Sequence, residues 1–224
     1  MVPASKAREL AVELLGIARN IASELGSADA LAAFERLLRL LSIYQSVSDR
    51  MYEDSVKLRK SAQDAETLTA EFVVNLNELQ QSKAVASLEK ARQDDSHAER
   101  VSLFATILCA LHPVAADAWK ILIEPDLKAK ATERFGIDKS GYAIALLQAL
   151  ADHRHDLDAY VALEKSKPEF RRDSYETARR LYEAQRFAEA LEWVRIRPTG
   201  IREHQRGGMR VGVGADNQSG SGRL

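Results

Sequence analysis

The chain has 224 residues, 46% of them hydrophobic and 29% charged, so it is long enough to bury a sizeable core. Its 32 basic and 33 acidic side chains nearly cancel, which gives no electrostatic reason to expect nucleic acid or an anionic membrane as the main partner. A single cysteine, Cys109, excludes an internal disulfide and a cysteine-rich zinc site.

The N-terminal residues resemble no targeting segment. Charged side chains, among them Lys6, Arg8 and Glu9, interrupt the apolar positions that a secretory signal would need. No part of the sequence approaches the roughly 20 apolar residues that span a bilayer. We therefore expect a cytoplasmic protein with no membrane partner.

An apolar stripe with spacings of three and four predicts a first helix over residues 5–25. We expect Gly26 to end that helix in the left-handed conformation and Ser27 to cap a second helix. The two-residue joint predicts an antiparallel hairpin. The second helix would bury a wide apolar face made of Leu31, Phe34, Leu37, Leu38, Leu41 and Tyr44.

The segment 51–79 has the 4-3-4-3 spacing of a heptad seam. Its members are Leu58, Ala62, Ala65, Thr69, Phe72, Leu76 and Leu79. Because several of them are small or polar, we expect this helix to pack on the protein's own helices, with a coiled-coil dimer as the alternative.

A short helix is predicted over 82–92, and a strongly apolar helix that begins near Val101 is the best candidate for the centre of the core. Pro113 should end that helix, because a proline disfavours helical backbone in the residue before it. Cys109 lies in this apolar run, so we interpret it as a small core residue, with a reactive thiol as the alternative.

The end of the ordered chain contains a repeat, since residues 142–164 and 175–194 each read as two short amphipathic helices. The first helices match at an offset of 32 and the second helices at an offset of 30, so the difference falls in the turn. Repeated helix pairs are typical of α-solenoids. We predict an all-α, α-solenoid-like array of antiparallel helix pairs, in which residues 1–138 form an N-terminal helical region continuous with tetratricopeptide-like pairs over 139–195.

Residues 196–224 differ in composition from the rest of the chain. They hold seven of the eleven glycines, no aromatic residue and no helical apolar stripe. Such a segment gains too little from burial to offset its ordering entropy, so we predict a disordered tail. A sharper hypothesis is that helices normally continue past Val194 and that this tail is out-of-frame sequence.

No phosphate-binding loop and no G-x-S-x-G or H-E-x-x-H motif occurs, so we expect neither catalysis nor a cofactor. His153 and His155, together with nearby aspartates, form the most suggestive metal-binding cluster. Arg154 between them opposes a cation, and the cluster falls in a predicted turn where Asp156 would cap the next helix. Turn and cap is the preferred interpretation, and metal binding stays open.

We predict a scaffold that binds an unidentified protein partner. Its surface would be made of Tyr175, Arg179, Tyr182, Arg186 and Trp193. The alternative is a helical-repeat nucleic-acid binder that uses the arginine-rich tail and a basic strip made of Arg171, Arg172, Arg179 and Arg180. Acidic neighbours at spacings that permit local ion pairs argue against this strip.

The order Ala178, Leu181, Phe187, Ala190 and Val194 resembles a tetratricopeptide repeat, although Gln185 replaces the usual turn glycine. More specifically, LLQALADHRHDLDAYVALEKSKPE, YETARRLYEAQRFAEALEWVR and the earlier ALAAFERLLRLLSIYQSVSDRMYEDS resemble an uncharacterised family of bacterial proteins, mostly proteobacterial, known only as a domain of unknown function. The resemblance covers much of residues 28–195. It implies a helical-repeat fold in an intracellular bacterial setting, with no established activity and no family site residues.

Overall fold

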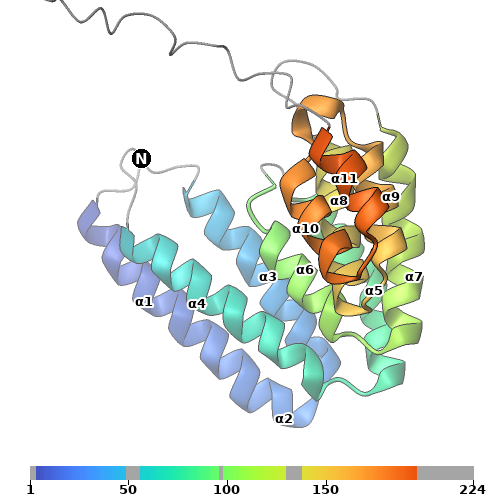
Figure 1. Ribbon diagram of the computed structural model, residues 1–224. Helices are drawn as coiled ribbons and strands as arrows, with labels where there is room; N and C mark the ends of the chain where they lie inside the picture. Colours follow the sequence, from blue (N-terminus) through green and yellow to red (C-terminus); the bar gives the residue numbers. More distant parts are fainter. Residues whose placement is uncertain (1–3, 49–55, 96–97, 130–137, 196–224) are drawn as a thin grey trace, which may run out of the picture.

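A computed structural model describes residues 4–48, 56–95, 98–129 and 138–195 of the chain (Figure 1). Within these ranges the regular secondary structure is entirely helical, which confirms the all-α prediction. The predicted tail over 196–224 lies outside the described residues. The longer helices are α1 (Ala4–Asn20), α3 (Ala30–Ser48), α4 (Val56–Phe72), α5 (Glu78–Gln93), α6 (Val101–Ala110), α7 (Pro113–Ile123), α8 (Lys139–His153), α9 (Leu157–Ser166), α10 (Ser174–Glu183) and α11 (Phe187–Arg195).

The helices pack in two rows. Helices α1, α4, α6 and α8 contact one another in that order, and α3, α5 and α7 do the same in a second row (Figure 1). Helices α3 and α4 touch between the rows, and the pairs α8–α9 and α10–α11 follow at the C-terminal end. The contact between α6 and α8 joins the N-terminal helices to the predicted repeat pairs.

The first hairpin forms, but not with the predicted caps. Gly26 is helical, with φ −58°, and a π-helical turn (Ile21–Leu25) and the short α2 (Gly26–Ala28) continue α1. Asp29 is the residue that leaves the helix, and its carboxylate accepts the backbone N–H of Ala32 at 3.0 Å. A Cβ at Gly26 would lie 2.8 Å from the ring of Phe72, so the glycine serves close packing against α4 rather than a left-handed stop.

Helix α4 packs on α1, α3 and α6, as expected for a seam that faces the protein's own helices. Leu58, Ala65 and Phe72 of this seam are buried. Leu79 is exposed, because a 3-10 turn (Val73–Asn75) ends α4 and places Leu79 in the first turn of α5.

The buried apolar side chains form two clusters. The larger cluster extends from α1 to α8, and in it Phe104 of α6 meets Trp119 of α7 edge to face at 6.0 Å, which confirms α6 as a central helix. The smaller cluster consists of Val161, Ala178, Leu181, Ala190 and Trp193. The last helix pair therefore has an apolar core of its own, seated on α9.

The two repeated turns share one backbone conformation. His155 and Gln185, thirty positions apart, have φ of 55° and 60°. In both turns a backbone N–H reaches back five residues to a carbonyl oxygen at 2.8 Å, from Asp156 to Ala151 and from Arg186 to Leu181. This is a Schellman-type helix end, usually built with glycine. The two turns that match in the sequence thus match in backbone conformation.

Candidate functional site

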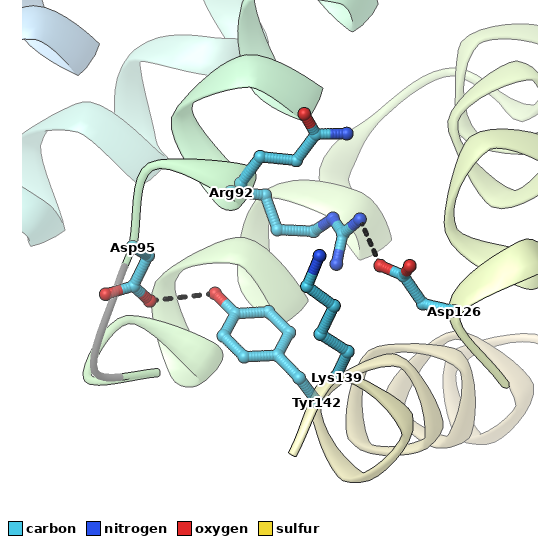
Figure 2. Close-up of a pocket in the computed structure, with 6 residues that line it drawn as sticks. Arg92, Asp95, Asp126, Lys139 and Tyr142 are labelled. Atoms are coloured by element: carbon cyan, nitrogen blue, oxygen red, sulfur yellow. Dashed lines mark hydrogen bonds and ion pairs between the residues drawn. The ribbon is translucent and has the colours of Figure 1, made fainter. Parts of the chain in front are cut away.

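A small polar cavity of about 50 Å³ lies where the end of α5, the turn after it and the start of α8 meet. The 3-10 turn Glu124–Lys128 closes another side of it. Figure 2 shows Arg92 and Tyr142 between Asp95 on one side and Asp126 on the other, with Lys139 alongside.

Arg92 is buried and anchors one half of this cavity. Its Nε and Nη2 donate to the two carboxylate oxygens of Glu89, at 2.9 and 2.6 Å, and Nη2 also donates to Asp126 at 2.7 Å. Trp119 of α7 donates its indole N–H to Glu89 at 3.0 Å. Burial alone would lower the pKa of Arg92, but the hydrogen bonds from this guanidinium to Glu89 and Asp126 outweigh burial and raise it.

Asp95 anchors the other half. Its carboxylate accepts the hydroxyl of Tyr142 at 3.0 Å and the backbone N–H of Arg100 at 3.0 Å. The Arg100 guanidinium then reaches the carbonyl of Leu41 in α3 at 2.6 Å. Burial and the charge of Asp95 raise the pKa of Tyr142. This half therefore connects α8 to α3 through buried polar groups.

Two of the groups that line the cavity, Tyr142 and Arg92, are unsuited to act as a base. Raised pKa values keep both Tyr142 and Arg92 protonated at neutral pH, so neither supplies a base or a nucleophile. In the part of the chain that the structure describes, every buried side-chain nitrogen and oxygen has a hydrogen-bond partner. We interpret the network as a polar clamp that holds α8 against α5. Sequence reasoning missed it, because Arg92, Asp95, Asp126 and Tyr142 share no local pattern.

A second buried polar joint connects the two repeat pairs. Glu164 of α9 is fully buried. Its carboxylate accepts hydrogen bonds from Gln148 of α8 and from Lys167, each at 2.6 Å, and from the backbone N–H of Asp173, which caps α10. Burial alone would raise the pKa of Glu164, but the bonds from Lys167 and Gln148 outweigh it and the pKa is lowered. The carboxylate therefore stays charged and fixes where α10 begins.

The predicted partner surface is only partly exposed. Tyr175 and Tyr182 are exposed, at 78% and 63%. Trp193 is buried in the small apolar cluster, so its assignment to an accessible surface was wrong. Its helical position faces α9 and α10 rather than the open side of α11. Arg179 and Arg186 are exposed or half-buried, but each is held by carboxylates of this chain.

The exposed apolar side chains of the last pair nevertheless form one surface. The rings of Tyr182 and Phe187 touch edge to face across the turn, with centroids 5.2 Å apart. Leu191 and Val194 follow Phe187 at spacings of four and seven, on the same side of α11. We call this surface the end face, and it consists of Tyr175, Tyr182, Phe187, Leu191 and Val194, all at least 50% exposed.

The four arginines of the alternative nucleic-acid strip are engaged within the protein. Arg171 pairs with Asp138, and Arg172 donates to the backbone carbonyls of residues 165 and 167. Arg179 pairs with two glutamates of α10, and Arg180 pairs with Asp152 and lies over the ring of Tyr160 at 4.2 Å. The hydrogen bond to Arg179 lowers the pKa of Glu176 to about 2.

The histidine cluster lies at the turn before α9, in agreement with the turn-and-cap interpretation. Asp156 accepts the N–H of Ala159 at 2.9 Å and caps α9. His153 and His155 are exposed. Among the described residues no three acidic, histidine or cysteine side chains are arranged to hold a metal ion.

Cys109 is half-buried rather than fully buried. Its thiol donates to the carbonyl of Ala149 at 3.4 Å. Burial, together with the charge of Asp152, raises the pKa of the thiol, which disfavours the reactive thiolate. The described helices also include none that is long and apolar enough to cross a bilayer.

A protein-family model described as a family of unknown function (DUF6880) matches residues 1–211. The resemblance to an uncharacterised domain family is therefore confirmed, and it supplies no activity. Neither the curated proteins nor the solved structures contain a significant match to the chain.

Proposed function

We propose that this chain, which belongs to the family of unknown function DUF6880, is a non-catalytic scaffold for protein–protein interaction. In this proposal its antiparallel helix pairs stack as an α-solenoid with tetratricopeptide-like pairs at the C-terminal end. The end face on α10 and α11 binds the partner. As the sequence resemblance implies, we place the scaffold in the bacterial cytoplasm.

The order of helix contacts supports the solenoid. Each helix of one row lies beside the helix two elements later in the chain, from α1 to α4, α6 and α8. The shared conformation of the turns at His155 and Gln185 supports repeat geometry in the last two pairs. Stacked pairs of this kind bury one face against each neighbour, and among the described helices none follows α11 to cover the face of the last pair.

One observation carries the proposal. The residues of α8 and α9 that correspond in sequence to the end face are covered by other parts of the protein, whereas the end face is open. These equivalents are Ala143, Leu150, Val161 and Glu164, which are buried, and Leu157, which is partly buried. A large exposed apolar surface at such a position is typical of an interaction site.

The arginine contacts favour protein over nucleic acid. Each arginine of the alternative strip already contacts a carboxylate or a carbonyl of this chain, so phosphate would have to compete with these contacts. Nucleic-acid binding, if present, should weaken steeply with salt. Fluorescence anisotropy with a labelled single-stranded RNA tests nucleic-acid binding when it is measured over an about fourfold range of salt, from roughly 50 to 200 mM. We expect no salt-sensitive binding.

Affinity capture from native cells tests the scaffold. The full chain is compared with the double variant Leu191→Glu/Val194→Glu and with the matched control Val114→Glu/Ile121→Glu, which places the same charges on exposed positions of α7. We expect the end-face variant to lose the captured partner at least about tenfold, equivalent to roughly 1.4 kcal/mol, while the control retains it. Equal capture by all three proteins, or none above background, would show that the proposed function is wrong.

A further inference from the structure

We infer that the end face takes a single amphipathic helix of another protein, held by apolar contacts. This inference rests on the proposed scaffold function and adds the chemistry of the partner. Residues of the preceding pair show what kind of segment fits such a face.

Helix α10 covers the α9 part of the surface that corresponds to the end face, whereas Ala143 and Leu150, which form the α8 part, belong to the larger cluster. Val161 of α9 packs there in one cluster with Ala178 and Leu181 of α10. At the end face Leu191 holds the position of Val161, thirty residues later, and it is 50% exposed. The segment seated on the covered face is a short helix with apolar residues three apart, which is also the pattern of helix-in-groove recognition.

The polar contacts that hold α10 in place have no counterparts at the end face. Glu164, which accepts the backbone N–H of the α10 cap residue Asp173, is replaced by Val194. Asp158, which pairs with Arg186 in the turn after α10, is replaced by Ala188. An occupant thus meets no buried carboxylate and needs no matching basic residue. We expect its contacting side to be apolar.

The size of the face fits one helix better than a second copy of the chain. A fully covered aromatic side chain buries about 150–250 Å², and the three rings of the end face are 55–78% exposed. With Leu191 and Val194 the face offers on the order of 500 Å², while a stable dimer needs about 800 Å² from each partner. A docked helix that brings two or three apolar anchors covers this area.

A displayed library of random peptides tests the inference on the full chain. Each peptide has about 18 residues, which is enough for roughly five helical turns. The library is selected on the unmodified protein and depleted on Leu191→Glu/Val194→Glu. We expect enriched peptides with apolar residues at spacings of three and four. Synthetic versions should bind the unmodified protein and the α7 control equally, bind the end-face variant at least about tenfold more weakly, and gain helical circular dichroism on binding.

Several outcomes overturn the inference. These are peptides that bind without becoming helical, peptides whose affinity ignores the variant, and a selection that enriches nothing. Peptide binding is also compared between the unmodified protein and Tyr175→Glu on α10. Tyr175 is 78% exposed, so we expect this change to leave the fold intact. Sedimentation equilibrium that shows a dimer abolished by either variant assigns the face to a second copy instead. If native capture still depends on the end face, the scaffold function stands and only the partner class is wrong.

Discussion

Val194 in α11 holds the position that Glu164 holds in α9, thirty residues earlier, and the two side chains have opposite surroundings. Glu164 is fully buried and binds the start of the next helix, whereas Val194 is 65% exposed. The turns at His155 and Gln185 share one backbone conformation, but the chemistry at matching positions changes in the last pair. A carboxylate that fixes the protein's own next helix gives way to an exposed apolar side chain.

Replacing Glu164 by alanine should destabilise the protein strongly. The substitution leaves the buried amide of Gln148 and the N–H of Asp173 without their acceptor, and Lys167 without its partner. We expect a loss of about 2–4 kcal/mol in the free energy of unfolding, measured by urea denaturation. Glu192→Ala, at an exposed position of α11, is the control and should change stability by less than about 0.5 kcal/mol. Similar free energies of unfolding for the two variants would show that Glu164 does not stabilise the joint.

Acid should weaken the joint between the repeat pairs. The pKa values of Glu164 and Glu176 are lowered, so the unfolded chain binds protons more readily than the folded protein. Their contribution is complete above the ordinary glutamate pKa of about 4.3 and is lost as the pH falls toward the folded values, about 2 for Glu176. Urea denaturation at several values between about pH 6 and pH 3 measures this loss. Acidification should lower the free energy of unfolding less in Glu164→Gln than in the unmodified protein. Parallel curves would argue against a charged Glu164.

Two glycines in the first helical segment should respond oppositely to alanine. At Gly26 the added methyl group would lie 2.8 Å from the ring of Phe72, so we expect a net loss of about 1–3 kcal/mol although alanine favours helix. At Gly16 nothing lies within 4 Å, so Gly16→Ala should stabilise the protein by about 0.5–1 kcal/mol. Thermal unfolding measures both. Stabilisation by Gly26→Ala would mean that α2 and α4 are not so close there.

The hydroxyl of Tyr142 should matter and that of Tyr182 should not. Tyr142→Phe removes the hydroxyl donor to the buried carboxylate of Asp95, at a cost of about 1–2 kcal/mol. Tyr182→Phe keeps the ring on the end face and should be neutral within about 0.5 kcal/mol. Chemical denaturation compares the two. Equal stability would show that the polar clamp does not hold α8.

The sequence by itself determined the helices and some local features, such as the cap at Asp156. Apolar spacings of three and four are local, and so is the cap at Asp156, since each depends on residues within one or two turns. The turn at Gln185 could be recognised as a repeat of the turn at His155 because the flanking helices match in sequence.

Only the tertiary structure decided which faces are covered and where the polar joints form. Arg92, Asp126 and Tyr142 meet because three separate elements converge, and no sequence spacing records that meeting. Gly26 was misread, because the ring that requires it belongs to another helix. Trp193 is buried and Val194 open although they are neighbours in one helix. Helical geometry gives each residue a direction, and only packing between helices determines which directions meet another part of the protein.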